Sequence, residues 1–242
     1  MRRSYMANPE SPESSKTVQD YLLSVYTLSS DGRSVIAARL AEALEVAPPT
    51  VTATLHRMTR DGLVTVNQNK EISLTDAGQA RAETMVRRHR LAERLLSDIL
   101  GLDWAEVHEE AHHFEHVISP RVEERILEIL GNPTTCPHGS PIPGTGARQS
   151  PDATRLESVQ VGSRVVIERV SEQAEGSHEL LSYFERAGLL PGREFDIQEI
   201  EPSNELMVLQ GDGESVPVGM AAAHTLWVRV LASDLPLAKL SA

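Results

Sequence analysis

The chain has 242 residues, enough for two or three small domains that each bury a core. Its formal net charge is −12, which argues against diffuse binding to nucleic acid but not against a local face that reads DNA. The single cysteine excludes an internal disulfide, no apolar run is long enough to cross a membrane, and the polar N-terminus lacks a secretory signal, so we expect a cytoplasmic protein.

The N-terminal segment changes from a disordered composition to a helical one. Residues 1–15 are rich in Ser, Pro and Glu, which is typical of disorder. A helix is predicted over residues 18–29, with Thr17 as its cap and Asp20 in its first turn. An acidic residue there commonly just complements the helix dipole, and the residues alone favour that interpretation of Asp20.

Two short helices follow. The first is predicted over residues 35–44, and the second begins at Pro49 and ends before Gly62. Their short connection predicts a helix-turn-helix whose second helix reads DNA. The side chains that we expect to contact DNA are Pro49, Thr50, Thr52, Arg57 and Arg60 on the second helix, Arg39 on the first, and Lys70 beyond them.

A hairpin is predicted directly after these helices. Residues 63–66 and 71–74 alternate apolar and polar side chains around a polar turn. A hairpin in this position is the wing of a winged helix, and Lys70 at its tip could reach a phosphate. The order of elements favours this fold over other small helical modules that end in a hairpin.

Potential metal ligands are concentrated on the next two helices. The long helix predicted over residues 76–100 carries His89 and Glu93 four residues apart, although such a pair is more often a surface ion pair. On the segment 104–119, four potential ligands fall on one stripe of a helix at about 100° per residue. They are His108, His112, Glu115 and His116. Imidazole and carboxylate suit borderline and hard divalent ions, so this stripe predicts a metal site rather than a solvated acidic face.

The remaining segments complete the domain organisation. Residues 120–130 form a further helix, and the helices of this domain together carry more apolar stripe than one chain needs, which indicates a dimer seam. Residues 131–151 form a loop rich in Pro and Gly. Cys136 and His138 in this loop are a weak zinc signal by themselves. Beyond it, short β-rich runs interrupted by one helix predict an SH3-like barrel, with Glu172 and Glu175 in an acidic loop before that helix.

The fold class is therefore multidomain α+β. The domains that we expect are a disordered tail (1–15), a winged helix-turn-helix (16–78), an all-α dimerisation and metal-binding domain (79–148), a linker (149–155) and a C-terminal SH3-like β-barrel (156–242).

Several long segments resemble a known family. They are PPTVTATLHRMTRDGLV, SLTDAG, MVRRHRLAERLLSDILGLD, EVHEEAHHFEHVIS and CPHGSPIPG, and they resemble the diphtheria-toxin-repressor family of metal-activated transcriptional regulators. The resemblance is strong over residues 17–143 and looser over 156–231. It implies a homodimeric repressor of metal-homeostasis genes that binds double-stranded palindromic operator DNA. It also implies two Mn²⁺ or Fe²⁺ ions per subunit, no small-molecule substrate and no enzymatic activity.

The resemblance also implies two ligand sets. The first comprises His89, Glu93, His108, Glu172 and Glu175, and the second comprises Asp20, His112, Glu115 and His116. The positions that tether an anion in the family fall on Arg90, Cys136 and Ser140.

Three positions depart from the iron-type pattern. Glu175 stands where iron-type members have an amide, and Asp20 resembles the manganese type rather than the Met of the iron type. His112 fits neither type, because iron-type members have Cys there and manganese-type members usually have Glu. This chain has carboxylate and imidazole where the iron type has thioether and thiolate, and these donors bind soft ions less well. We therefore expect Mn²⁺ in preference to Fe²⁺.

Two other classes of function fit parts of the sequence. Residues 108–112 read HExxH, as in zinc metallohydrolases in which the Glu, here Glu109, acts as general base. Such enzymes need a distal third ligand and a cleft beside an edge strand, which this region does not offer. Purely structural zinc sites favour Cys-rich tetrahedra, whereas the ligands here are spread over several domains. Both alternatives are disfavoured.

Overall fold

The computed structural model describes residues 15–231, so residues 1–14 of the expected disordered tail lie outside the described residues. The chain divides into two compact units, residues 1–85 and 86–242, and the boundary falls inside one helix. Each unit is described by itself. Within the described range, no helix is both long and apolar enough to span a membrane.

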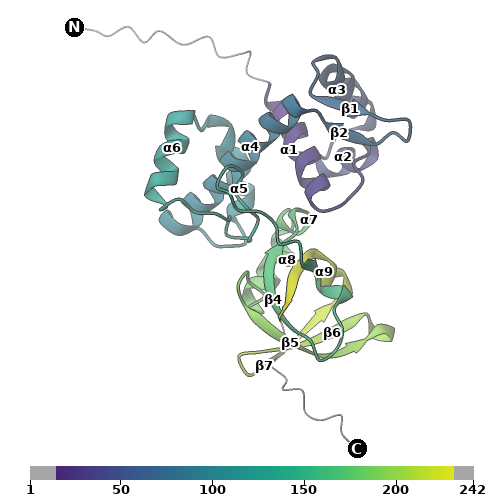
Figure 1. Ribbon diagram of the computed structural model, residues 1–242, viewed down its shortest axis with the longest axis vertical. Coiled ribbons are helices and arrows are strands. Elements are labelled where there is room, and N and C mark those ends of the chain that lie inside the picture. The colour runs from purple at the N-terminus through teal and green to yellow at the C-terminus, as the bar shows by residue number, and fades with distance from the viewer. Residues whose placement is uncertain (1–14, 232–242) are drawn as a thin grey trace, which may run out of the picture. The chain divides into compact units, whose positions relative to one another are not determined.

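The first unit is a winged helix-turn-helix. Its elements are α1 (Lys16–Ser30), α2 (Ala37–Ala43), α3 (Pro48–Arg60), β1 (Val64–Val66) and β2 (Ile72–Leu74) (Figure 1). The two strands pair in antiparallel fashion, and Ile36 adds an isolated bridge to Glu71 beside them. Apolar side chains from every element form the core, among them Tyr21, Leu22, Leu40, Met58 and Ile72.

The helices that follow the wing include two turns that are not α-helical, where the sequence predicted continuous α-helices. Its elements are α4 (Asp76–Arg94), the π-helical turn η1 (Leu95–Ile99), α5 (Val107–Phe114), the 3-10 turn η2 (Glu115–Val117) and α6 (Pro120–Ile129). The helix predicted over residues 104–119 therefore ends at Phe114. Glu115 and His116 of the predicted stripe therefore lie on the 3-10 turn η2, which has a tighter winding than an α-helix.

The loop that follows α6 is packed rather than loose. Thr135 forms an antiparallel bridge with Pro141, and Cys136, His138 and Ile142 are buried. Gly139 adopts φ +91°, and a Cβ atom at this position would lie 2.1 Å from the carbonyl oxygen of Glu168. This close approach ties the loop to the C-terminal domain.

The C-terminal part of the second unit is the expected SH3-like domain. Its six-stranded antiparallel sheet has the order β3-β8-β4-β5-β6-β7. The strands are β3 (Ala153–Arg155), β4 (Arg164–Val170), β5 (Glu194–Glu201), β6 (Leu206–Gly211), β7 (Glu214–Gly219) and β8 (Leu226–Leu231). Since β3 pairs with β8, residues 153–155 belong to this sheet and not to the expected linker.

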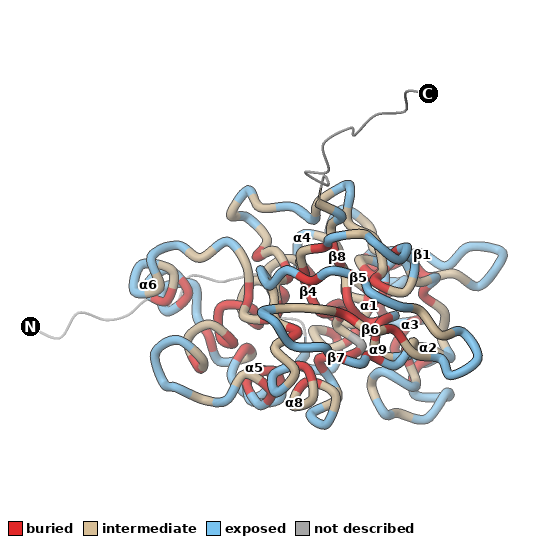
Figure 2. The backbone as a smooth tube through the Cα atoms, turned by 90° about the horizontal axis from the view of Figure 1, so that it is seen from below, coloured by how far each residue is buried: buried red, intermediate tan, exposed pale blue. Residues whose placement is uncertain are grey.

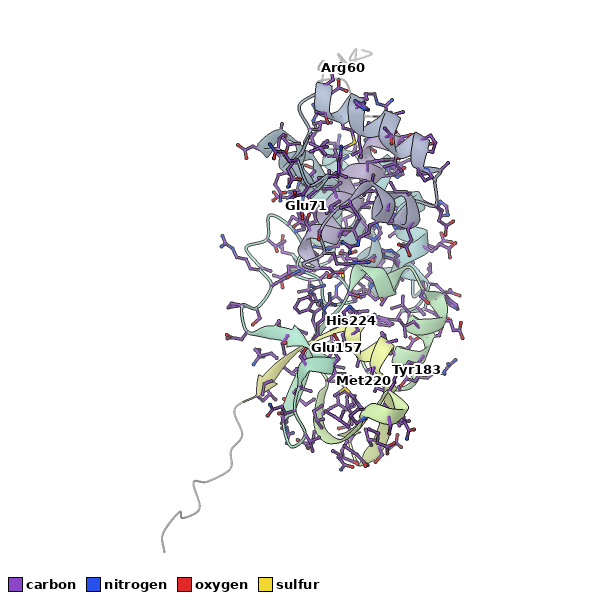
Figure 3. All side chains as sticks on the ribbon, turned by 90° about the vertical axis from the view of Figure 1, so that its right-hand side faces the viewer. Arg60, Glu71, Glu157, Tyr183, Met220 and His224 are labelled. Atoms are coloured by element: carbon purple, nitrogen blue, oxygen red, sulfur yellow. The ribbon has the colours of Figure 1, made fainter. Side chains whose placement is uncertain are left out.

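Short helices complete this domain. They are η3 (Leu156–Ser158), α7 (Glu172–Glu175), α8 (His178–Arg186), η4 (Pro202–Asn204) and α9 (Met220–Thr225). Figure 2 shows buried residues along the strands, where side chains such as Val165, Ile167 and Leu209 form the core with Phe184. On the surface, His224 of α9 lies 2.6 Å from a carboxylate oxygen of Glu157, and both side chains are visible in Figure 3.

Candidate metal centre

Three of the predicted ligands meet between α4 and α5. His89 and Glu93 lie one turn apart on α4, and their side chains are buried. His89 Nε2 lies 3.1 Å from Glu93 Oε1 and 3.1 Å from His108 Nδ1, and that Nδ1 lies 3.0 Å from Glu93 Oε1. The His89–Glu93 pair is therefore part of a buried cluster and not a surface ion pair.

The SH3-like domain contributes a fourth of the predicted ligands. Glu175, at the end of α7, places Oε2 3.2 Å from His108 Nδ1, and its side chain is buried. Its other oxygen, Oε1, and the Oε2 atom of Glu93 are buried without a hydrogen-bond partner among residues 15–231. A buried carboxylate oxygen without a partner is costly, and a bound cation would satisfy both of these oxygens.

Glu172 has a different partner from the members of this cluster. Its Oε1 accepts a hydrogen bond from Arg90 Nη2, and the guanidinium also donates from Nη1 to the Pro141 carbonyl. Of the first predicted ligand set, the structure brings four members together, whereas Glu172 is bound to an arginine. Arg90, Cys136 and Ser140, the predicted anion tethers, are all buried, and Arg90 donates to Pro141 and Glu172 of the chain itself.

Two further donors were missed as ligands by the sequence prediction. His138 is completely buried, with Nδ1 3.4 Å from Glu93 Oε1, and its Nε2 donates to the Trp104 carbonyl at 3.0 Å. The Cys136 thiol, a Glu93 oxygen and a His138 nitrogen lie within 4.8 Å of one another. The only signal in the sequence was the weak pairing of one Cys and one His in the Cys-Pro-His segment.

The second predicted set gathers around Glu115. This carboxylate is fully buried, with Oε1 3.4 Å from His116 Nε2 and 3.7 Å from His112 Nδ1. Its Oε2 lies 2.6 Å from His89 Nδ1, and the His112 ring centroid lies 4.6 Å from that of His89. The two predicted sites are therefore adjacent within the second unit, and they share the contact between His89 and Glu115.

Asp20 belongs to the first unit and lies on α1. The helix begins at Lys16, two residues earlier than predicted, so Asp20 is its fifth residue. No acidic residue occupies the first turn. The helix dipole acts mainly on the first turn, so the dipole interpretation of Asp20 loses its basis.

The buried charges stabilise one another without a metal. Burial lowers the pKa of His108, but the carboxylates of Glu175 and Glu93 outweigh it and raise the pKa to about 9. Burial raises the pKa of Glu115, but His112 and His89 outweigh it and lower the pKa to about 2. Burial lowers the pKa of His112, as do the neighbouring histidines, which favours its neutral, ligating form. The donor set of imidazoles and carboxylates, with one thiol, fits a divalent transition metal.

The predicted DNA-contacting side chains lie on the first unit. Pro49, Thr50, Thr52, Arg57 and Arg60 are exposed along α3, and Lys70 is exposed at the tip of the wing. Arg60 lies at the end of α3 in Figure 3. Arg39 is half-buried, and its Nη1 donates to the Ser34 carbonyl. Glu109 of the HExxH pattern is exposed, in contrast to the buried His108 before it.

Comparison with known proteins shows the family. Residues 13–72 match the N-terminal DNA-binding domain of iron-dependent repressors, and residues 75–144 match their metal-binding and dimerisation domain. The chain belongs to the iron-dependent repressor family. Residues 154–230 match the FeoA domain. The family consists of transcriptional repressors rather than enzymes, so the HExxH pattern does not mark a zinc hydrolase here.

Relatives of both metal types are similar to this member of the family. The iron-dependent repressor IdeR of Mycobacterium leprae is 39% identical over 224 residues, covering 88% of this chain and 96% of the relative. The diphtheria toxin repressor of Corynebacterium efficiens is 41% identical over 189 residues, covering 75% and 82%. A solved manganese-dependent transcriptional repressor in complex with manganese has a TM-score of 0.81 and 32% identity, covering 88% of this chain and all of that one. The winged helix, helical domain and SH3-like domain are confirmed.

Proposed function

We propose that this repressor is activated by a divalent metal, Mn²⁺ in preference to Fe²⁺, and binds palindromic operator DNA as a homodimer. The observation that carries the proposal is the buried cluster of His89, Glu93, His108 and Glu175, with two carboxylate oxygens that lack a partner. These two buried oxygens are expensive to leave without a partner, and a bound cation would remove that cost.

Two ions per subunit are proposed. The first would be held by His89, Glu93, His108 and Glu175, with His138 and Cys136 beside them. The second would be held by Asp20, His112, Glu115 and His116. A bound divalent ion supplies the positive charge that carboxylates and imidazoles from separate segments can share.

The switch follows from where these ligands lie in the chain. Asp20 belongs to the unit that carries α3, whereas His112, Glu115 and His116 belong to the second unit. Residues of both units that share one ion would fix the orientation of the recognition helix relative to the dimerisation domain. Metal then favours the DNA-competent state by the difference between its affinities for the two states.

The surface of the helical domain supports a homodimer. Exposed apolar side chains lie at the end of η1 and on η2 and α6, namely Ile99, the following Leu100, Val117, Val122 and Ile129, and Val117 is 72% exposed. Apolar residues that gather on one domain indicate a protein interface. A two-fold dimer would present its two α3 helices to successive turns of the major groove, which matches a palindromic operator.

The preference for Mn²⁺ rests on the chemistry of the donors. The two proposed sets consist of carboxylate oxygens and imidazole nitrogens, and only Cys136 beside the first set is a soft donor. An Fe²⁺-specific regulator of the same family is the competing possibility, and the metal titration below separates the two.

An operator-binding titration tests the function. Operator DNA would be selected from random duplexes with the Mn²⁺-loaded protein, and binding would then be followed by fluorescence anisotropy at defined free Mn²⁺, Fe²⁺ and Zn²⁺. We expect no specific binding with chelator and activation by Mn²⁺ at the lowest free concentration. His112→Cys should shift the preference toward the softer ions. Operator binding without any metal would overturn the proposal, and activation by Fe²⁺ at lower concentration than Mn²⁺ would overturn the preference.

A further inference from the structure

An arginine of α4 binds the loop that carries Cys136 and His138. Arg94 directly follows Glu93, and its Nε donates to the Thr135 carbonyl at 2.8 Å. Its Nη2 donates to the Cys136 carbonyl at 3.2 Å and lies 3.5 Å from the Thr135 hydroxyl. The planar guanidinium thus binds two successive carbonyls, which fixes the orientation of this backbone as well as its distance from α4.

The backbone that Arg94 binds is the start of a tight turn. The Gly139 amide donates to the Cys136 carbonyl at 3.0 Å, and a proline and His138 lie between these two residues in the chain. Proline at the second position and glycine at the fourth are residues that a type I turn favours. Because the Cys136 carbonyl accepts from both Gly139 and Arg94, the arginine is attached to the turn as a whole.

The same turn directs two potential ligands at Glu93. His138 is completely buried, and its Nδ1 lies 3.4 Å from Glu93 Oε1 without a hydrogen-bond partner among residues 15–231. Its other ring nitrogen donates to the Trp104 carbonyl, so in the neutral ring Nδ1 carries the lone pair that a metal needs. The Cys136 thiol belongs to the same group of donors, which lie within 4.8 Å of one another. A shift of the turn would therefore move a nitrogen and a sulfur donor together.

A second arginine of α4 binds the other end of this loop. Arg90 lies one helical turn before Arg94, and its guanidinium donates to the Pro141 carbonyl. Thr135 and Pro141 form the antiparallel bridge that closes the loop, so both sides of the bridge are attached to α4. Residues four apart lie on the same side of a helix, which explains how both arginines reach one loop. Arg94 supplies no ligand itself, because a guanidinium stays protonated, so its effect on a metal must pass through the loop.

We propose that Arg94 is a positioning residue of the first metal site. By binding the carbonyls of Thr135 and Cys136, it holds the turn so that the Cys136 thiol and His138 Nδ1 stay beside Glu93 and can share an ion with it. This role rests on the proposed function, because the site that Arg94 serves is the first of the two proposed metal sites. The ion pair of Arg94 with an aspartate of η1, at 3.4 Å, is partly exposed and contributes little.

The variants Arg94→Gln and Arg94→Lys in the full-length protein test this role. Glutamine removes both the charge and the forked donors, whereas lysine keeps the charge but cannot bind two carbonyls in one plane. Both variants should weaken Mn²⁺ binding at one class of site by about tenfold in equilibrium dialysis and leave the other class unchanged, as expected for a group that supports a metal ligand. Wild-type Mn²⁺ affinity in Arg94→Lys would show that the charge alone acts, and would overturn the proposal.

A Cd²⁺ titration reports on the position of the turn independently of DNA binding. Cys136 is the only cysteine of the chain, so any near-ultraviolet charge-transfer band of a Cd²⁺–thiolate bond belongs to it. The wild type should develop this band, because a thiolate is a soft ligand that suits such an ion. Both Arg94 variants should lose most of the band at saturating Cd²⁺, because the sulfur no longer stays beside Glu93. A band of wild-type strength in both variants, or no band in the wild type, would overturn the proposal.

Trp104→Phe is the matched control for stability. It removes the hydrogen bond from Trp104 Nε1 to the Pro137 carbonyl, so the same turn loses a donor while both bonds of Arg94 remain. We expect it to lower thermal stability, as the Arg94 variants do, and to keep the Mn²⁺ affinity and the Cd²⁺ band. Equal losses of affinity and band in all three variants would overturn a specific role of Arg94. Operator binding by the metal-free wild type would refute the proposed function, whereas dialysis and the Cd²⁺ band would still decide the role of Arg94.

Discussion

The Nδ1 atom of His89 lies 2.6 Å from Oε2 of Glu115, and this contact joins the two proposed metal sites. The other ring nitrogen of His89 faces Glu93 and His108. A histidine that ligates a metal through one nitrogen normally donates from the other to a carboxylate, which orients the ring and raises its basicity. Glu115 can therefore orient a ligand of the first site while its Oε1 serves the second.

Glu115→Gln should weaken both sites at once. Glutamine keeps an acceptor for His89 but loses the charge, and loss of such an outer partner typically costs about 10–100-fold in metal affinity. The second site would also lose a charged ligand. Equilibrium dialysis with Mn²⁺ should show weaker binding in both classes of site.

His116→Ala is the matched control for this coupling. Its Nε2 lies 3.4 Å from Glu115 Oε1, and it belongs to the second proposed ligand set alone. We expect it to weaken one class of Mn²⁺ site and leave the other unchanged. If Glu115→Gln behaves in the same way as His116→Ala, the two sites are not coupled through His89.

His138→Phe should weaken the first site by about tenfold, within the range for groups that support a metal site. Phenylalanine fills a similar volume but removes Nδ1, which lies 3.4 Å from Glu93 Oε1. It also leaves the Trp104 carbonyl without its donor, so we expect a stability loss of about 1–3 kcal/mol. Mn²⁺ titration and thermal unfolding of the metal-free protein measure the two effects.

Trp104→Phe separates these effects. It removes the 3.0 Å hydrogen bond from Trp104 Nε1 to the Pro137 carbonyl, which is next to His138 in the chain. Unlike His138→Phe, it takes no potential metal ligand away from Glu93. We expect it to lower stability and leave Mn²⁺ affinity within about twofold of the wild type, since no metal-facing group is lost. A similar loss of affinity in both variants would mean that His138 acts only through packing.

Arg57→Ala should lower operator affinity in a salt-dependent way. Arg57 is exposed on α3 and is expected to contact a phosphate. Each phosphate contact contributes about 0.9 to the slope of log affinity against log salt concentration, so the slope should become shallower by about that amount per lost contact. Arg125→Ala, which removes an exposed cation of α6, should leave the slope unchanged. An unchanged slope in Arg57→Ala would remove this residue from the interface.

The elements were predictable where local patterns determine them. The winged helix followed from turn and alternation signals, and the SH3-like domain followed from its short strands. The predicted cap Thr17 was wrong, because α1 begins at Lys16 and its N-cap is Ser15. The π-helical turn at residues 95–99 and the end of α5 at Phe114 were not predictable, because the apolar spacing continues through both. Two of the four residues of the predicted stripe therefore lie outside the α-helix, although Glu115 Oε1 still lies 3.7 Å from His112 Nδ1. Glu115 and His116 reach the cluster from a 3-10 turn instead.

The sequence also did not show which side chain each buried carboxylate contacts. Glu172 and Glu175 have the same chemistry and lie three residues apart, yet one faces Arg90 and the other faces His108. Arg90 precedes Glu172 by 82 residues, so only the packing of α7 against α4 decides this choice. His138 was missed for the same reason, since one Cys and one His in a loop predict little until Glu93 lies beside them.

Asp20→Ala tests the switch itself. Because Asp20 lies beyond the first turn of α1, its removal should have little effect on the helix dipole. If Asp20 shares an ion with His112, Glu115 and His116, its loss should abolish metal-dependent operator binding while the dimer stays intact. Operator titration with Mn²⁺ and light scattering measure the two properties.

Glu42→Ala provides the control for charge in this test. Glu42 is an exposed acid of α2 in the same unit, so its loss changes the net charge equally and removes no proposed ligand. Less repulsion between the unit and DNA should raise operator affinity slightly and keep the metal response. Asp20→Ala should instead lower the operator affinity, because the free energy that links metal binding to DNA binding would be lost. Retained metal-dependent binding in Asp20→Ala would exclude a shared ion as the element that orients the recognition helix.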